Sequence, residues 1–179
     1  KRMIVLAPTG IAAINAGGVT IHSFFQVPFA PYVPESSFSA DGKATYRFRY
    51  GKEKINIIRS IDLLVIDEIS MVRADLLDSV DAVLRRFRDR NKPFGGVQLL
   101  MIGDLQQLSP VVKDDEWQML CKYYDTPYFF SSQALKQTEY CTIELKKVYR
   151  QNDGTFLELL NRIRENRCDG QVLEALNRR

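Results

Sequence analysis

The stretch that most constrains the fold of this chain is a short apolar run that ends in two carboxylates. Four apolar residues, Leu63 to Ile66, lead directly into Asp67 and Glu68. A run of this length predicts a strand that is buried on both faces, as in a parallel sheet. In an open parallel sheet, ligands bind at the carboxyl ends of the strands. The sequence therefore predicts a sheet edge at which two adjacent carboxylates meet a ligand.

The chemistry of the Asp67–Glu68 pair suits a magnesium ion and a water molecule. The first carboxylate can hold Mg²⁺ through its oxygens, and the second can orient or deprotonate an attacking water. This is the pattern of a Walker B motif. The alternative is a strand that simply ends in solvated acidic residues, and the pattern alone does not separate the two. Other stretches of the chain decide between them.

Composition places the chain among ordinary globular domains and leaves its partners open. Of its 179 residues, 45% are hydrophobic and 26% are charged, which allows one substantial core and excludes the disordered and collagen-like classes. The net charge of +3 permits a nucleic-acid partner without requiring one. No run approaches the length of a membrane span, so we expect no membrane partner.

The three cysteines bear on the cellular compartment. Cys121, Cys141 and Cys168 are odd in number and far apart, with neither a metal-ligand spacing nor a disulfide-rich density. We therefore expect reduced thiols and an intracellular location. That location would be the cytoplasm of a bacterium, or the nucleus or mitochondrion of a eukaryote.

Predicted strands and helices alternate along the chain. Strands are predicted at residues 3–7, 63–66, 97–102, 128–130 and 142–148. Helices are predicted at 11–16, 73–89 and 114–124, then behind a capping box of Thr155 and Glu158, and from Gln171 onward. The proline-containing segment 26–51 reads as an irregular insertion with a short strand or hairpin at 46–50. This alternation predicts an α/β fold with a doubly wound sheet.

A glutamine pair follows the predicted strand at 97–102. Gln106 and Gln107 carry uncharged amides that both donate and accept hydrogen bonds, as sensing a terminal phosphate and a neighbouring water requires. Such a pair on its own is more typical of surface turns. Its position after a second apolar strand, downstream of the Asp–Glu pair, favours the functional interpretation.

An arginine follows the predicted strand at 142–148. The planar fork of Arg150 can neutralise charge that develops on a transferring phosphate, as an arginine finger does. On residue type alone, one more surface arginine is the commoner case. Only the neighbouring sequence favours the phosphate contact.

Four segments together resemble the Pif-type DNA helicases of superfamily 1B, which are relatives of the RecD-like helicases. The segments are APTGIAAINAGGVTIHSFF (7–25), LLVIDEISMV (63–72), GDLQQLSPV (103–111) and ELKKVYRQND with the following F, LN and IR (144–164). The resemblance covers roughly residues 3–165. It implies a RecA-like domain of the P-loop NTPase type, a mostly parallel sheet flanked by helices. It also implies a motor that uses ATP and Mg²⁺ to move 5′-to-3′ along single-stranded DNA.

The resemblance implies roles for individual residues at the nucleotide. Asp67 would match the magnesium-coordinating acid, and Glu68 the catalytic base that activates water beside the same ion. Gln107 would match the catalytic glutamine that senses the γ-phosphate. The other nucleotide-contacting positions would be Gly103 and Asp104, which shape the loop, and Arg150, which contacts phosphate.

The resemblance also implies a path for nucleic acid. Pro8, Thr9 and Gly10 would match the DNA-contacting motif, with His22 and Phe25 beside the strand. A threonine hydroxyl and backbone N–H groups at a helix start can hold a backbone phosphate, and a ring can stack on a base for about 1–3 kcal/mol. A hydrogen-bonded structural role for His22, the only histidine, remains an alternative.

One motif of these helicases is missing. The phosphate-binding string G-x-x-x-x-G-K-[ST] occurs nowhere in the chain. We therefore expect residues 1–148 to be part of a first RecA-like motor domain that lacks its P-loop strand. Residues 149–179 would be a helical segment leading toward an absent second RecA-like domain, which would be its partner in the same protein. Such a fragment should hydrolyse ATP negligibly.

The missing strand has a consequence for the sheet. We expect the strands that end at Pro8, Asp67 and Asp104 to be contiguous, and the strand at 128–130 to lack its neighbour. An exposed edge of this kind can pair with a second chain. We hypothesise a fragment dimer or a displaced strand.

Two other functions stay open from the residues alone. One is a P-loop ATPase that is not a helicase, in which the 7–25 segment would have no evident use. The other is a nucleic-acid-binding or interaction module that kept the fold and lost the motor.

Overall fold

A computed structural model of the chain describes residues 2–33, 50–147, 149 and 153–178. The chain divides into two compact units, Lys1–Glu139 (unit 1) and Tyr140–Arg179 (unit 2), and each is described by itself. Arg150, residues 46–49 of the predicted strand and most of the predicted insertion lie outside the described residues. Within the described ranges, no helix combines the length and the apolar character needed to cross a membrane.

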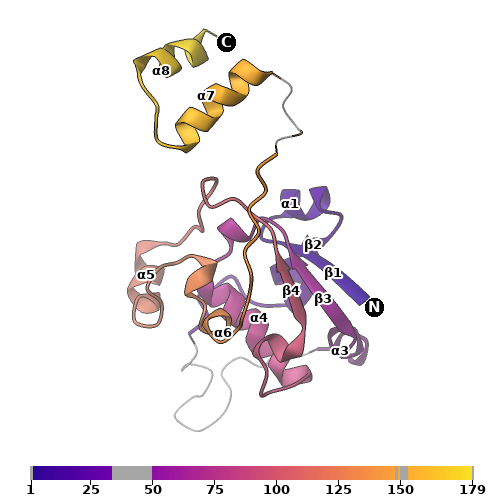
Figure 1. Ribbon diagram of the computed structural model, residues 1–179. Helices are drawn as coiled ribbons and strands as arrows, with labels where there is room; N and C mark the ends of the chain where they lie inside the picture. Colours follow the sequence, from indigo (N-terminus) through magenta and orange to yellow (C-terminus); the bar gives the residue numbers. More distant parts are fainter. Residues whose placement is uncertain (1, 34–49, 148, 150–152, 179) are drawn as a thin grey trace. The chain divides into compact units, whose positions relative to one another are not determined.

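Unit 1 is built on a four-stranded parallel sheet. The strands are β1 (Arg2–Ala7), β2 (Val19–Thr20), β3 (Ile61–Ile66) and β4 (Gln98–Met101), in the order β2-β1-β3-β4 (Figure 1). Leu6 pairs with Ile66, and Ile66 pairs with Met101, so β1, β3 and β4 end at the same level. The predicted α/β class and the contiguity of these three strands are confirmed.

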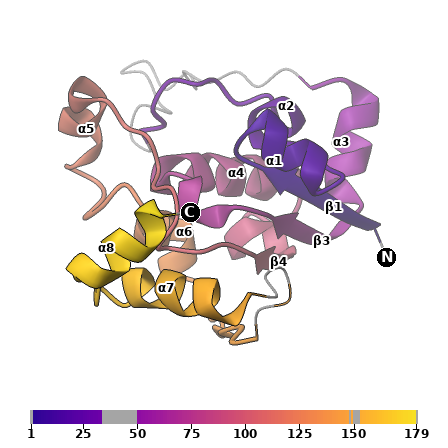
Figure 2. The same ribbon diagram turned by 90° about the horizontal axis from the view of Figure 1, so that it is seen from above.

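Helices connect the strands and cover one face of the sheet. Unit 1 contains α1 (Gly10–Asn15), α2 (Ile21–Phe25), α3 (Lys52–Arg59), α4 (Ala74–Phe87), α5 (Asp114–Leu120) and α6 (Gln133–Lys136). It also contains the 3₁₀ turns η2 (Ile69–Met71), η3 (Pro93–Gly96) and η4 (Phe129–Ser131). Figure 2 shows α2, α3 and α4 on the same side of the strands. The helices α2, α3 and α6 were not predicted.

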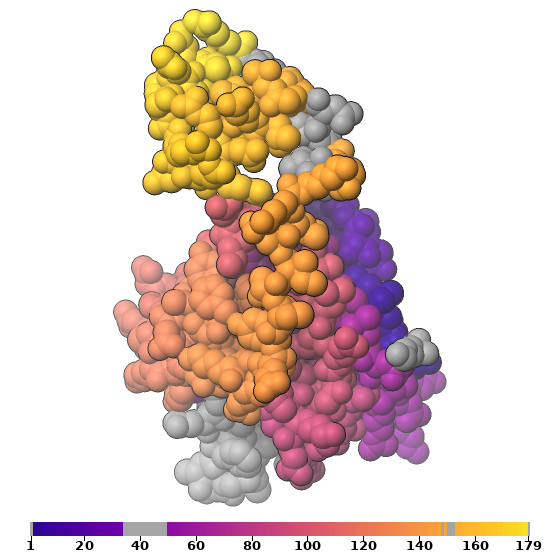
Figure 3. All heavy atoms as spheres, in the orientation of Figure 1, coloured from indigo at the N-terminus to yellow at the C-terminus, as the bar shows by residue number. Residues whose placement is uncertain are grey.

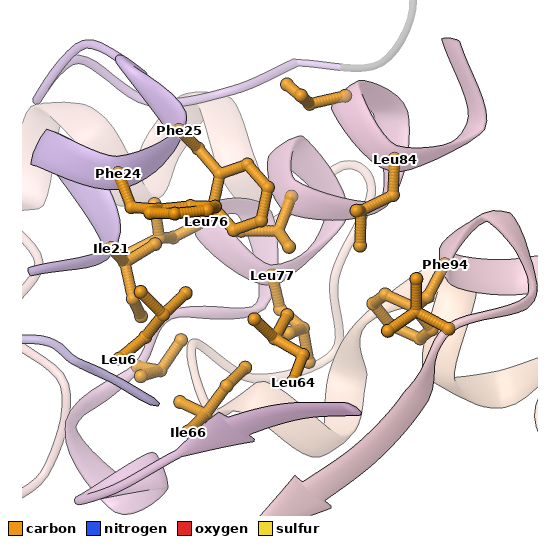
Figure 4. Packing of buried hydrophobic residues seen from close by; sticks show 14 of the residues in the cluster. Leu6, Ile21, Phe24, Phe25, Leu64, Ile66, Leu76, Leu77, Leu84 and Phe94 are labelled. Carbon is orange, nitrogen blue, oxygen red and sulfur yellow. The ribbon is translucent and has the colours of Figure 1, made fainter. Parts of the chain in front are cut away.

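The main core fills the space between this sheet face and its helices. Leu64 and Ile66 of β3, Leu77 of α4 and Phe25 of α2 are fully buried and belong to one cluster (Figure 4). Burying each such side chain stabilises the fold by about 1.5–3 kcal/mol. In the space-filling view of Figure 3, the atoms of unit 1, coloured from indigo through pink to light orange, pack closely together.

The other face of the sheet is less well covered. Side chains alternate between the two faces of a strand. Met3 is 59% exposed, and Leu100 and Ile102 are 46% and 45% exposed. The predicted burial on both faces holds for β3, where Leu64 and Ile66 are fully buried and Val65, on the opposite face, is 7% exposed. The neighbouring strands β1 and β4 are partly open on that second face.

Two predicted strands are wrong. Among the described residues, Tyr128 forms only an isolated antiparallel bridge with Arg73. Phe129–Ser131 is the turn η4, closed by the Ser131 N–H donating to the Tyr128 carbonyl (2.9 Å). Residues 142–147 form neither strand nor helix, and Ile143 and Leu145 are exposed. A strand needs a hydrogen-bonding neighbour, which sequence pattern cannot guarantee.

Unit 2 contains α7 (Gly154–Arg164) and α8 (Gly170–Asn177). Both helices were predicted, but the cap of α7 was not. Asp153 rather than Thr155 is the N-cap residue, and its Oδ1 accepts the Phe156 N–H (3.0 Å). Asp and Thr both serve as caps, so the local sequence did not distinguish the two starting points.

Candidate functional site

The candidate site lies where β1, β3 and β4 end. Asp67 directly follows β3, and its N–H donates to the Leu6 carbonyl of the neighbouring strand (2.8 Å). The Oδ1 of Asp67 accepts the Glu68 N–H (3.0 Å). Both side chains are half-buried, and in the described part of the chain neither forms an ion pair. The sheet therefore presents two carboxylates at its carboxyl edge, as predicted.

Glu68 has an uncommon backbone conformation. Its φ is +51° and its ψ is +43°, in the left-handed region that costs a non-glycine residue about 1–3 kcal/mol. The following turn η2 holds this conformation, because the Ile69 N–H donates to the Ile102 carbonyl (2.9 Å) and the Met71 N–H to the Glu68 carbonyl (3.0 Å). Strained residues of this kind cluster at functional sites.

Gly103 brings the second predicted motif against the first. A Cβ atom at Gly103 would lie 2.9 Å from Ile69 Cγ2 and 3.1 Å from the Ser70 nitrogen, so only glycine allows this approach. The loop after β4 therefore begins directly beside the turn that follows Glu68.

Asp104 and Gln107 are linked in the same loop. Asp104 is half-buried, and its Oδ1 accepts the Gln106 N–H (3.0 Å). Its Oδ2 accepts an Nε2–H of Gln107 (3.2 Å), whose side chain is exposed. The structure thus collects Asp67, Glu68 and the Gly103–Gln107 loop at one edge of the sheet.

The carboxylate pair fits a magnesium ion of the phosphate-bound kind. No group of three or more His, Cys, Asp or Glu side chains that could hold a metal occurs among the described residues. Mg²⁺ is commonly held by one or two carboxylates, with water and substrate phosphates completing its shell. The Oδ2 of Asp67 and the carboxylate oxygens of Glu68 suit such a partial set.

Three of the predicted nucleic-acid residues share a cavity on the same side of unit 1. Pro8, Thr9 and His22 line a cavity of about 270 Å³ together with Phe29 and Met71. Thr9 is the N-cap of α1, and its Oγ1 accepts the Ala12 N–H (3.2 Å). Met71 belongs to η2, so the cavity and the Asp67–Glu68 pair are separated by a single turn of chain.

His22 lies at the wall of this cavity. Its ring stacks on Phe29 with centroids 4.4 Å apart and an interplanar angle of 19°. Burial lowers the pKa of His22 from its usual 6.5, nearby Arg73 lowers it further, and Asp75 opposes both. The neutral imidazole is therefore favoured near pH 7.

Phe25 and Gly10 differ from the other predicted nucleic-acid residues. Phe25 is fully buried and packs edge-on against Phe24, so its ring is not exposed to stack on a base. Phe25 is therefore a core residue and not the predicted nucleic-acid contact, because α2 directs its side chain toward the main hydrophobic cluster. Gly10 is the first residue of α1 and has open space where a Cβ would stand.

Sequence reasoning missed the charged group beneath the cavity. Arg73 donates to Asp75 through Nε and Nη2 (2.8 Å each) and to Glu116 through Nη1 (3.2 Å). Asp75 Oδ2 also accepts the Tyr32 N–H (2.9 Å). Glu116 is 43 residues from Arg73 in sequence, so no spacing signal could have joined them.

The sheet order, the carboxylates after β3 and the glycine-led loop after β4 define a RecA-like α/β domain. The model of the PIF1-like helicase family matches residues 1–172, and the chain belongs to this family.

Individual relatives agree with this assignment. The chain is 39% identical to the human ATP-dependent DNA helicase PIF1 over 97% of its length and 24% of that protein. It is 34% identical to the ATP-dependent DNA helicase RRM3 of Saccharomyces cerevisiae, with 92% of the chain and 21% of that protein covered. The chain thus spans about a quarter of the length of these relatives.

Solved structures show the same fold. A Bacteroides Pif1 helicase in complex with ADP-AlF3 and ssDNA matches with a TM-score of 0.90 at 43% identity, covering 97% of this chain and 39% of that one. The Pif1 helicase from Candida albicans matches with a TM-score of 0.73 at 32% identity, covering 97% of this chain and 36% of that one. The predicted RecA-like fold and the predicted family are confirmed.

Proposed function

We propose that this chain is part of the motor of an ATP-dependent DNA helicase that moves 5′-to-3′ along single-stranded DNA. The observation that carries the proposal is the meeting of two separately predicted residue groups at one sheet edge. The Asp67–Glu68 pair and the Gly103–Gln107 loop lie together, and the cavity of Thr9 and His22 begins one turn away. A related Pif1 helicase carries ADP-AlF3 and ssDNA in its structure, which supports both ligands.

At the nucleotide, we assign one role to each residue. Asp67 would hold Mg²⁺, which supplies charge neutralisation for the phosphates. Glu68, in its fixed turn, would orient and deprotonate the attacking water. Gln107 would contact the terminal phosphate. Arg150, outside the described residues, is proposed as a further phosphate contact.

At the nucleic acid, we assign Pro8, Thr9, Gly10 and His22 and leave out the buried Phe25. The Thr9 hydroxyl keeps its hydrogen to donate to a phosphate while it caps α1. A second RecA-like domain of the same protein would complete the motor. The match to PIF1-like helicases does not favour the two alternatives, a non-helicase ATPase or a module without a motor.

A hydrolysis assay tests the nucleotide site. In the full-length protein we expect ATPase activity that requires Mg²⁺ and is stimulated by single-stranded DNA. Glu68→Gln should lower kcat by about 100-fold or more, because it removes the base. Asp62→Asn, on the same strand but exposed at its opposite end, is the matched control and should leave kcat unchanged. Wild-type kcat in Glu68→Gln would refute the assignment.

A binding assay tests the nucleic-acid site. We expect this chain to bind single-stranded DNA weakly and in a salt-sensitive way, as phosphate contacts imply. Thr9→Ala and His22→Ala should weaken the binding in fluorescence anisotropy. Thr9→Ser keeps the hydroxyl and the cap, and Ser23→Ala changes an exposed neighbour of His22, so both controls should bind like the wild type. Equal binding by all variants would remove these residues from the site.

The missing phosphate-binding string gives a third test. Without it, the 179-residue chain should hydrolyse ATP negligibly even with Mg²⁺ and DNA present. Turnover above the Glu68→Gln background in this chain would contradict that expectation.

A further inference from the structure

In the loop after β4, the carboxylate of Asp104 accepts a hydrogen bond from the side-chain amide of Gln107. Asp104 offers two oxygens to its own loop: Oδ1 accepts the Gln106 N–H (3.0 Å), and Oδ2 accepts an Nε2–H of Gln107 (3.2 Å). The Asp104 carbonyl also accepts the Gln107 N–H (3.1 Å). One residue thus shapes the backbone of the turn and holds the side-chain amide of Gln107.

A carboxylate can hold this amide in one orientation only. The two ends of a glutamine amide have nearly the same shape, and an exposed glutamine can present either end. An ionised carboxylate accepts hydrogen bonds and cannot donate them, so the Nε2 of Gln107, and not its Oε1, must face Asp104. The Oε1 of Gln107 and its second Nε2 hydrogen are then turned away from Asp104.

This orientation lets Gln107 supply both an acceptor for the attacking water and a donor for the phosphate. An attacking water must donate a hydrogen bond to an acceptor while its oxygen approaches phosphorus, and a phosphate oxygen accepts from a donor. With Nε2 held by Asp104, Oε1 is available to the water and the second N–H to the phosphate. The reversed amide would place both N–H groups outward, so Gln107 would offer the water no acceptor for the hydrogen that Glu68 does not take.

We propose that Asp104 is a positioning residue that sets the amide orientation of Gln107 for ATP hydrolysis. The inference rests on the proposed function, and it goes beyond a loop-shaping role because it assigns separate tasks to the two oxygens. Oδ1 maintains the turn, and Oδ2 maintains the amide orientation.

One substitution separates these two tasks. In Asp104→Asn, the amide oxygen can still accept the Gln106 N–H and keep the turn. The new NH₂ group then faces Gln107 and pairs with Oε1, which reverses the Gln107 amide. Asp104→Ala removes both contacts and reports on the turn as well.

The test is a mutant cycle in the full-length protein, with DNA-stimulated ATPase activity measured over a range of ATP concentrations. Asp104→Asn should lower kcat about 10- to 100-fold and change the KM for ATP less than about threefold. Gln107→Ala combined with Asp104→Asn should be no slower than Gln107→Ala alone, because the two residues act as one unit. Asp115→Asn, an exposed acid of α5, should leave kcat unchanged.

Two kinetic results would overturn the proposal. One is wild-type kcat in Asp104→Asn. The other is a double variant that shows the full product of the two single losses, since that result would mean independent roles.

The contact itself has a readout that does not need activity. In protein labelled with ¹⁵N at glutamine, one Nε2 proton of Gln107 should resonate at low field and return to the ordinary position in Asp104→Asn. An identical Gln107 signal in both proteins would overturn the proposal directly. If the signal shifts as expected but the wild-type full-length protein has no ATPase activity, the proposed function fails, and the role given to Asp104 fails with it.

Discussion

At the scale of single residues, backbone geometry rather than side-chain chemistry brings the two halves of the candidate site together. Glu68 adopts a left-handed conformation, and Gly103 lets the loop after β4 contact Ile69 and Ser70. Both requirements fall on the main chain and not on the side-chain atoms that would react. Changes at these positions should therefore affect both stability and hydrolysis.

Gly103→Ala tests the close approach. The new Cβ would lie 2.9 Å from Ile69 Cγ2 and 3.0 Å from the Ile69 nitrogen, so the turn after Glu68 must shift. We expect the free energy of unfolding in urea to fall by about 1–3 kcal/mol. Gly10→Ala is the matched control, because it meets open space at a helix start and should not destabilise. Equal effects of the two substitutions would contradict the contact.

His22 should make stability depend on pH. Its pKa in the folded state is below 6.5, so the unfolded chain binds the proton first as the pH falls. The stability that neutral His22 contributes is present above about pH 6.5 and is lost as the pH falls through 6.5 toward the lowered folded pKa. The Tm of the wild type should drop more between about pH 7.5 and about pH 5 than the Tm of His22→Gln. Identical drops would exclude His22 as the source.

At the scale of elements, α4 organises unit 1 through buried acids as well as through its apolar face. Asp78 is 6% exposed and accepts four hydrogen bonds. The donors are the Tyr124 and Ser132 hydroxyls and the backbone N–H groups of Gln133 and Ala134. Burial raises the pKa of the Tyr124 hydroxyl, and the neighbouring negative charge of Asp78 raises it further. This single carboxylate ties α4 to the start of α6 and to the segment after α5.

Removing this carboxylate should be costly. Asp78→Ala leaves four donors without this acceptor, three of them buried, and we expect it to lower the free energy of unfolding by about 3–5 kcal/mol. Tyr124→Phe removes one of these bonds and should cost about 1 kcal/mol. Asp125→Ala removes an exposed ion pair with Lys136 and should change stability by less than about 0.5 kcal/mol. A cost for Asp78→Ala as small as that for Asp125→Ala would refute this role.

At the scale of the whole molecule, the sheet of unit 1 has an open edge and a partly open face. Among the described residues, β4 has a hydrogen-bonded neighbour on one side only. Leu100 and Ile102 are about half exposed beside that edge. An apolar strand edge of this kind can pair with another strand.

The open edge leads to a prediction about association. We expect the 179-residue chain to form dimers whose fraction rises with concentration, measured by multi-angle light scattering. Leu100→Lys should shift the equilibrium to monomer, because a charge at an edge strand opposes pairing. Leu173→Lys changes a similarly exposed leucine on α8 and should leave the equilibrium unchanged. A monomeric mass at every concentration would rule out the dimer.

The sequence alone determined the parts of this protein that depend on neighbours in the chain. An apolar run into Asp67–Glu68 marked β3 and its edge, and the helical spacing of Leu77, Val80 and Leu84 marked α4. The motifs at 7–25 and 103–111 indicated the family correctly. Periodicity and side-chain chemistry are local properties, so they can be read from the sequence without knowing the fold.

Only the tertiary structure decided what depends on residues distant in sequence. The run at 128–130 has the composition of a strand, but in the described part of the chain it has a single bridging partner, Arg73, and forms a turn instead. Phe25 resembles a stacking residue in its motif, but its position on α2 places the ring in the main core. Asp78 and Arg73 reach partners 43 or more residues away. Burial and strand pairing depend on which surfaces of the chain come into contact. The spacing of residues along the sequence does not predict these contacts.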